Sequence, residues 1–271
     1  MTYRWYHEVS AEWLRARRTV LTATDVAGLM PEYKRYLKAG DPDKIMPGFA
    51  ALWCQKHSSS EPDPSSIGPA ARGHIMEPWA VQSWNSQVPD EKYNHWDNCI
   101  ICRNVFGFSP DAMNIAQPKE LAKVQVALDG SILVDAVENK LYSNAPTEIM
   151  EIKCYEPAKH MKSVIKGKME HDELMQIAMA FVVLPKLQYA RLLWFCPDSP
   201  FSMHTEVYTS DDLHDHIRWI LEIGEVYMKQ AALCEKIVSS GLTAQCTERE
   251  VYEDYIAEKE TSLNSIFLLK G

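Results

Sequence analysis

Glu151 and Lys153 are the residues whose types and spacing best suit chemistry in this 271-residue chain. They stand two apart in residues 147–154, a short apolar stretch that predicts a β-strand. Side chains two apart on a strand share a face, so the acid and the base would lie side by side, while Met150 and Ile152 face a core. Burying both charges costs free energy unless they pair with each other or interact with a bound ion or water. A divalent cation on Glu151, with Lys153 placing a water, would use them, and an ordinary salt bridge is the alternative.

Two further acids could complete a metal site with this strand. Asp129 ends a predicted strand in a Leu-Asp-Gly sequence, and Glu77 lies on a predicted helix among small and apolar neighbours. Mg²⁺ in proteins is held by a few carboxylates plus waters, so Asp129 and Glu151 on neighbouring strands could share one ion. Asp111, in the Ser-Pro-Asp sequence at 109–111, is a rival for Asp129, and Asp135 is a weaker third candidate.

The elements that must position these residues follow the order helices, antiparallel strands, helix, strands, helices. We expect N-terminal helices over 10–57, a core over about 68–209 and C-terminal helices over 210–271. The core contains a predicted hairpin at 124–137 and an apolar helix at 171–184. This order predicts a single α/β or α+β domain with one mixed sheet flanked by helices.

Composition narrows the class of protein. The net charge of −9 argues against a protein that coats nucleic acid nonspecifically, but it allows a nuclease with a local basic groove. Lysines do cluster just after the Glu-x-Lys strand, at 159, 162, 166 and 168. No apolar run approaches the length of a membrane span, and the N-terminus lacks the apolar core of a signal peptide. The seven scattered cysteines favour a reducing cytoplasm.

Five short motifs follow one another along the chain, and their order matters as much as their residues. They are Trp13 with the arginines and Thr-Ala-Thr that follow to Thr24, Gly73 to Pro78 with its glutamate, Leu128-Asp129-Gly130, Glu151-Ile152-Lys153-Cys154, and the helix around Gln176. Together they resemble the PD-(D/E)xK nuclease superfamily, and within it the phage lambda exonuclease group, also called YqaJ-type viral recombinases. The resemblance runs from about Trp13 to Phe181.

The resemblance implies a site for Mg²⁺, with Mn²⁺ as a possible substitute. Asp129, Glu151 and the backbone carbonyl of Ile152 would bind the metal, and Glu77 would support a second metal or a water. Lys153 would be the catalytic lysine, and Gln176 would support the active site. A pocket for the 5′-terminal phosphate of DNA would include Arg17, Thr24 and Lys159. Three positions depart from the family pattern, because Ala127 stands where a serine is sometimes found, Ala178 where a second glutamine is common, and Lys159 where an arginine is expected.

The activity implied is 5′→3′ degradation of duplex DNA from a 5′-phosphate end, which leaves 3′ single-stranded tails for phage-type recombination. The resemblance also implies a ring-shaped homotrimer around double-stranded DNA, a single-strand annealing protein as partner, and a place in the cytoplasm of a bacterial or phage-infected cell. Alternatives are another PD-(D/E)xK nuclease, acting as an endonuclease or on single strands, and an inactive DNA-end-binding protein with the same fold.

Overall fold

The structure of the protein is a computed structural model that describes residues 4–5, 17–57, 70–96, 99–115, 123–126, 132–135, 140–142, 146–167 and 171–241. The chain divides into two compact units. The first comprises Met1–Thr24 and Ser60–Leu221, and the second comprises Asp25–Ser59 and Glu222–Gly271. All the candidate site residues belong to the first unit, so the fold of that unit decides how they are arranged.

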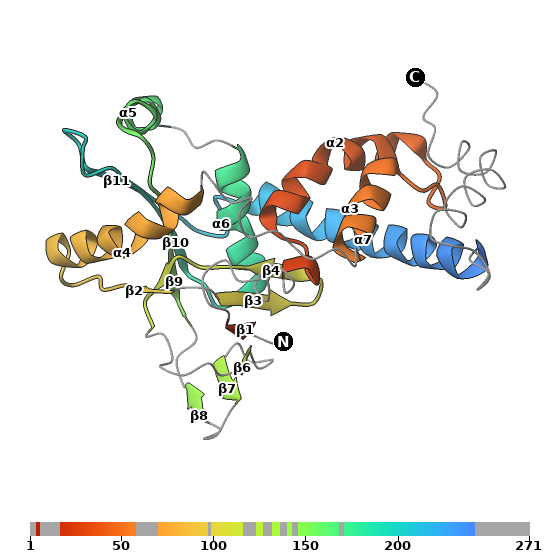
Figure 1. Cartoon of the computed structure of the whole chain (residues 1–271), viewed down its shortest axis with the longest axis horizontal. Helices are drawn as coiled ribbons and strands as arrows, with labels where there is room; N and C mark the ends of the chain where they lie inside the picture. The colour runs from red at the N-terminus through yellow and green to blue at the C-terminus, as the bar shows by residue number, and fades with distance from the viewer. Residues whose placement is uncertain are drawn as a thin grey trace. The chain divides into compact units, whose positions relative to one another are not determined.

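A five-stranded sheet forms the centre of the first unit (Figure 1). Its order is β11 (Met203–Tyr208), β10 (Tyr189–Phe195), β9 (Glu148–Lys153), β5 (Ala112–Met113) and β2 (Asn94–His95). β9 and β10 are parallel, whereas the other three pairs are antiparallel. The sheet is therefore mixed, as the order of elements predicted. β9 is the strand that carries the Glu-x-Lys sequence, and it lies at the middle of the sheet.

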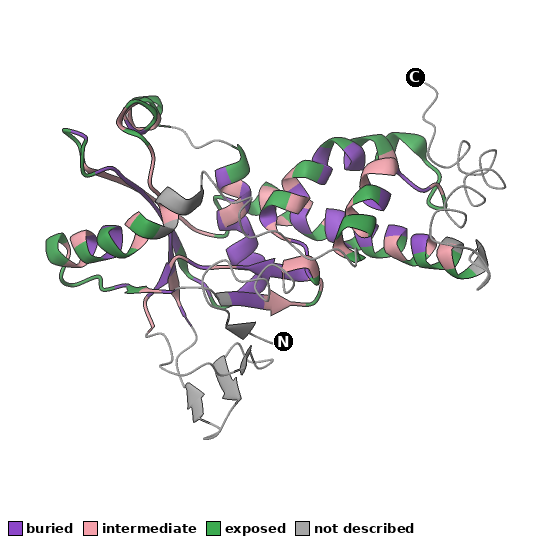
Figure 2. Cartoon of the chain, in the orientation of Figure 1, coloured by how far each residue is buried: buried purple, intermediate pink, exposed green. Residues whose placement is uncertain are grey.

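Helices cover both faces of β9. Met150 and Ile152 pack on one face into a core that includes Ala80 and Trp84 of α4 (Ala70–Gln87). Figure 2 shows that α4 has a buried and an exposed side, as expected of a helix that packs on a sheet. α6 (His171–Val183) is largely buried and packs on the other face, where it meets Lys153. α5 (Pro157–Lys166) follows β9 directly in the chain.

Two smaller sheets complete the strands of this unit. One has the order β1 (Arg4–Trp5), β3 (Cys99–Arg103), β4 (Phe106–Phe108). The other, β6 (Lys123–Val126), β7 (Ile132–Asp135) and β8 (Lys140–Tyr142), is antiparallel and includes the hairpin that the sequence predicts. These three strands belong to a sheet of their own and none of them pairs with β9.

An N-terminal segment lies along β4. The N–H of Leu21 donates to the carbonyl of Val105 at 2.7 Å, and the N–H of Gly107 donates to the carbonyl of Leu21 at 2.9 Å. A Cβ atom on Gly107 would overlap Cγ2 of Val20, so only glycine allows this close approach. The approach places the segment that contains Arg17 and Thr24 beside β4, the outer strand of this smaller sheet.

The second unit is helical. It contains most of α2 (Ala23–Ala39), α3 (Pro47–His57) and the part of α7 (His214–Gly241) after Leu221. Its core includes Ile45, Ala50 and Cys234. Gln230 is buried and joins α7 to the start of α3, because its side chain accepts from the N–H of Met46 and donates to the carbonyl of Lys44. Helical structure predicted before residue 17 and after residue 241 falls outside the described residues. Among the helices described, none is long and apolar enough to cross a membrane.

Candidate active site

Glu151 and Lys153 lie side by side on β9, as the strand period predicts. Lys153 Nζ donates to Glu151 Oε1 at 2.7 Å and to Gln176 Oε1 of α6 at 2.6 Å. Glu151 is buried, with 5% of its surface exposed. The acid and the base are therefore fixed together, and Gln176 orients the lysine from the helix that covers this face.

Asp111 joins this pair from the neighbouring strand. It immediately precedes β5, and Ala112 of β5 pairs with Met150, so the antiparallel register places Asp111 opposite Glu151. The N–H of Ile152 donates to Asp111 Oδ2 at 2.7 Å. Because the N–H and C=O of one strand residue point to the same side, the Ile152 carbonyl also faces the Asp111 side. Two carboxylates and a main-chain carbonyl thus converge at the end of β5.

The charges in this cluster perturb one another. Burial, with the negative charges of Glu151 and Glu77, raises the pKa of Asp111 well above its ordinary value, although Lys153 and the Ile152 N–H oppose the shift. For Lys153, burial alone would lower the pKa, but the carboxylates of Glu151 and Asp111 outweigh it and raise the pKa above 10.5. Lys153 is therefore an ammonium at neutral pH, and the acids around it repel one another in surroundings that solvate charge poorly.

The donor set fits a hard divalent cation. Carboxylate and carbonyl oxygens are the ligands that Mg²⁺ prefers, with waters completing its shell. Asp111, Glu151 and the Ile152 carbonyl would supply them, and a cation there would relieve the repulsion between the acids. In the part of the chain that the structure describes, no three His, Cys, Asp or Glu side chains form a ready-made metal cage. Oxygen donors of this kind suit a hard divalent cation, whereas zinc is bound mainly by nitrogen and sulfur.

Glu77 lies at the margin of the cluster. Its helix α4 packs against β9, and its charge contributes to the raised pKa of Asp111. Its Oε2 is 3.8 Å from His95 Nε2. A Cβ atom on Gly73 would lie 3.3 Å from Glu77 Oε1, so the glycine one turn earlier leaves room for this carboxylate. Glu77 is thus close enough to Asp111 for its charge to act on that carboxyl group.

Asp129 and Asp135 are the other two candidates for the core aspartate. The expectation that the 124–137 hairpin neighbours the Glu-x-Lys strand is wrong, because β6 and β7 pair in a separate sheet and β5 and β10 flank β9. Asp129 itself lies outside the described residues, and Asp135 ends β7. The long interval between Asp111 and Glu151 is occupied in part by β6, β7 and β8, which explains how the two residues meet across forty positions.

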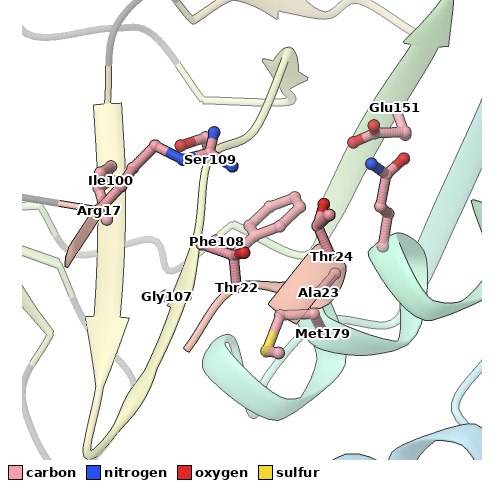
Figure 3. A pocket seen from close by; sticks show the side chains of 11 residues that line it. Arg17, Thr22, Ala23, Thr24, Ile100, Gly107, Phe108, Ser109, Glu151 and Met179 are labelled. Carbon is pink, nitrogen blue, oxygen red and sulfur yellow. The ribbon is translucent and has the colours of Figure 1, made fainter. Parts of the chain in front are cut away.

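A pocket opens beside the cluster. Glu151 and Gln176 form one side of it, and Arg17, Thr22, Thr24 and Ser109 contribute its other polar groups. Figure 3 shows Arg17 extending toward Ser109 across the strand that carries Phe108. The structure thus brings together Arg17 and Thr24, which were predicted as phosphate ligands, with the acid Glu151.

Ser109 is a pocket residue that the sequence reasoning missed. It stands two positions before Asp111, whereas the choice of Asp129 as core aspartate places the expected serine at Ala127. Lys159, in contrast, does not line this pocket. Its ammonium lies 3.7 Å from the ring centroid of Tyr155, near the start of α5.

Comparisons with known proteins were made by family, by sequence and by structure. No family model matches the chain, and no curated protein matches it in sequence. Among solved structures, an alkaline exonuclease (LHK-Exo) from Laribacter hongkongensis aligns with 94% of this chain and 99% of its own, with a TM-score of 0.50 and 16% identity.

The same enzyme in complex with dAMP gives a TM-score of 0.50 and 17% identity, with the same coverage. A phage-related exonuclease from Haemophilus somnus 129PT aligns less well, with a TM-score of 0.35, 10% identity and 70% of this chain covered. The chain therefore shares its fold with an alkaline exonuclease, as its resemblance to the lambda exonuclease group predicts.

Proposed function

We propose that this protein is a Mg²⁺-dependent exonuclease that degrades duplex DNA 5′→3′ from a 5′-phosphate end. The observation that carries the proposal is the convergence of Asp111, Glu151 and the charged Lys153 at one end of β5, on the fold of an exonuclease. We propose Asp111, rather than Asp129, as the core aspartate, since its carboxylate bonds to the strand residue between Glu151 and Lys153.

Each group has a separate role in hydrolysis. Asp111, Glu151 and the Ile152 carbonyl would hold the divalent ion, which polarises a phosphodiester and acidifies a water when bound. Lys153, which is held by Glu151 and Gln176, would orient the attacking water and stabilise the charge that develops on the phosphate. Glu77 would support a bound water or a second ion from α4.

The adjoining pocket supports attack next to a 5′ end. Arg17 supplies a guanidinium that can bind a phosphate through two parallel hydrogen bonds, and Thr24 and Ser109 add hydroxyl donors. Because Glu151 lines the same pocket, a terminal phosphate bound there would place the first phosphodiester near the acids. Such a pocket would favour substrates that carry a 5′ phosphate and would set the direction of digestion.

The wider setting follows from the family resemblance. We propose that the product is a 3′ single-stranded tail used in phage-type recombination, that the enzyme forms a homotrimer around duplex DNA, and that a single-strand annealing protein is its partner. Action in the cytoplasm of a bacterial or phage-infected cell would suit these roles.

The decisive experiment compares linear duplex DNA with and without a 5′ phosphate, in Mg²⁺, Mn²⁺ or EDTA. Wild-type protein should release mononucleotides only with metal and faster from the phosphorylated end. Lys153→Ala should lose cleavage, and Arg17→Ala should lose the preference for the 5′ phosphate. Cutting of closed circles would instead indicate an endonuclease. Binding of DNA ends without cleavage in either metal would indicate an inactive end-binding protein.

A further inference from the structure

α5 carries three exposed lysines on one side. Lys159, Lys162 and Lys166 are spaced three and four apart, which places them along one face of a helix. The ten residues of α5 contain no Asp or Glu, although the whole chain has a net charge of −9. None of the three lysines forms an ion pair with a residue that the structure describes. In Figure 2 the surface of α5 is largely exposed. We call these three residues the lysine face.

The opposite side of α5 is anchored. His160 is fully buried, and its Nε2 lies 2.6 Å from the carbonyl oxygen of Phe201 in the turn between β10 and β11. A carbonyl only accepts, so Nε2 carries the proton and donates it. Pro157 begins the helix, and Gly167 ends it with φ of 55°, a conformation that favours glycine. The lysine face is therefore presented by a helix with fixed ends and a fixed buried side.

A second anchor links the lysine face to the active site. The hydroxyl of Tyr155 donates to Oε1 of Glu173, which is buried on α6 one turn before Gln176. Gln176 in turn accepts from Lys153. The Tyr155 ring, fixed in this way, is the surface on which the Lys159 ammonium lies, a cation–π contact. The same helix α6 thus orients the catalytic lysine and the first residue of the lysine face.

We propose that the lysine face of α5 binds the phosphate backbone of double-stranded DNA and guides the duplex toward Glu151 and Lys153. This inference rests on the proposed nuclease function. Lysine ammonium groups act as point charges on flexible stems, which suits contacts to phosphates irrespective of sequence. From Lys159 to Lys166 the helix rises roughly 10 Å, which matches about three phosphates along the axis of one DNA strand. Lys159 would then contact a phosphate of the backbone rather than the 5′-terminal one.

The test measures duplex binding separately from cleavage. Binding of a labelled DNA duplex is followed by fluorescence anisotropy in EDTA from about 50 to 200 mM salt, the range over which phosphate contacts change affinity most visibly. The variant is Lys162→Gln with Lys166→Gln. The control is Lys34→Gln with Lys38→Gln, which removes the same charge from two exposed lysines four apart on α2. Thermal unfolding of both variants confirms that each still folds.

We expect the slope of log Kd against log salt to fall by about two in the α5 variant, roughly one for each lost phosphate contact, and to stay unchanged in the control. In cleavage assays KM should rise with kcat unchanged. Equal slopes for wild type and the α5 variant would overturn the proposal that the lysine face binds DNA, even if wild-type protein cleaves DNA. A reduced slope without any cleavage would support the lysine face and contradict the nuclease. Absence of duplex binding by wild type would overturn both.

Discussion

Asp111 accepts a 2.7 Å hydrogen bond on Oδ2 from the backbone N–H of Ile152. Ile152 stands between Glu151 and Lys153, so this bond ties the end of β5 to the part of β9 that carries the acid and the base. It also brings the Asp111 carboxylate to the side of β9 that the Ile152 carbonyl faces. A short link between a side chain and the main chain thus assembles three oxygen donors from two strands.

The first prediction separates the two candidates for the core aspartate. Asp111→Asn keeps the size of the side chain but removes its charge, so we expect Mg²⁺-dependent cleavage to fall more than about 100-fold. A change in an outer-shell residue alone costs about 10–100-fold in metal affinity or activity, and a direct ligand should matter more. Asp129→Asn should leave cleavage near the wild-type rate.

The measurement for both variants is the rate of nucleotide release at saturating DNA, with Mg²⁺ binding followed by calorimetry. Loss of activity in Asp129→Asn with little change in Asp111→Asn would identify Asp129 as the metal ligand. Loss in both would mean that the segment around Asp129, which lies outside the described residues, contributes to the same site.

The sequence predicts the parts of this site that depend on neighbouring residues and not the parts that depend on residues far apart in the chain. The neighbouring positions of Glu151 and Lys153 follow from the two-residue period of a strand, a purely local property, and the structure has them 2.7 Å apart. The pairing of β5 with β9 spans forty residues, and the Leu-Asp-Gly sequence between the two strands is a local signal that favours Asp129 over Asp111. Strand pairing over such a distance has no local sequence signal.

The pocket and the second unit show the same limit. The arginine and threonine motif predicts that Arg17 and Thr24 act together, and both line the pocket beside Glu151. Ser109 was missed because a serine is expected in the pocket only two residues before the core aspartate, and the sequence favours Asp129 as that aspartate. The grouping of α2 and α3 with the end of α7 joins segments more than 160 residues apart, as the bond from Tyr33 to Glu222 illustrates (separation 189). Helix periodicity identifies such segments but not their partners.

Gln176 provides a test of how Lys153 is held. Gln176→Ala removes one of the two acceptors of the lysine ammonium, and a hydrogen bond to a charged group contributes about 1.5–3 kcal/mol. If the bond orients Lys153 in the transition state, kcat should fall roughly 10- to 100-fold while KM changes little. Gln82→Ala, the same change on the exposed side of α4, is the matched control and should have no effect. A rise in KM alone would show that Gln176 binds DNA instead.

Tyr93 should make the stability of the protein depend on alkaline pH. Burial is the main cause that raises the pKa of Tyr93 above its ordinary value of 10.0, and its hydrogen bond to Glu148, at 2.9 Å, adds to the effect. The folded state then keeps the phenol proton at pH values where the unfolded chain has lost it. Stability is full below pH 10 and falls as pH rises above it, because the folded state binds more protons there.

Tyr93→Phe should flatten this alkaline fall, as measured by urea unfolding between neutral pH and the alkaline range. At neutral pH the variant should be less stable by about 1 kcal/mol, the usual contribution of one hydrogen bond. Tyr189→Phe alters an exposed tyrosine of β10 and serves as the control. An alkaline fall of the same steepness in Tyr93→Phe would assign it to other groups.

Gly107 should connect the stability of the fold to the proposed recognition of the DNA end. Alanine at this position would place Cβ against Cγ2 of Val20, a β-branched side chain with little freedom to move, so the segment along β4 must shift. Overpacking of this kind costs about 1–3 kcal/mol. Since the displaced segment carries Arg17, the variant should also discriminate less between DNA with and without a 5′ phosphate, while Lys153 keeps its partners and cleavage persists.

Gly28→Ala is the matched control, because Gly28 lies within α2 and nothing stands within 4 Å of an added Cβ. Removing a glycine from a helix should stabilise the protein by about 0.5–1 kcal/mol and leave end discrimination intact. Thermal unfolding and the two-substrate cleavage assay measure both effects. If Gly107→Ala is destabilised but still distinguishes the two ends fully, the strand contact supports the fold alone and Arg17 does not depend on it. If both properties change together, the close approach at Gly107 is what holds the phosphate pocket beside Glu151.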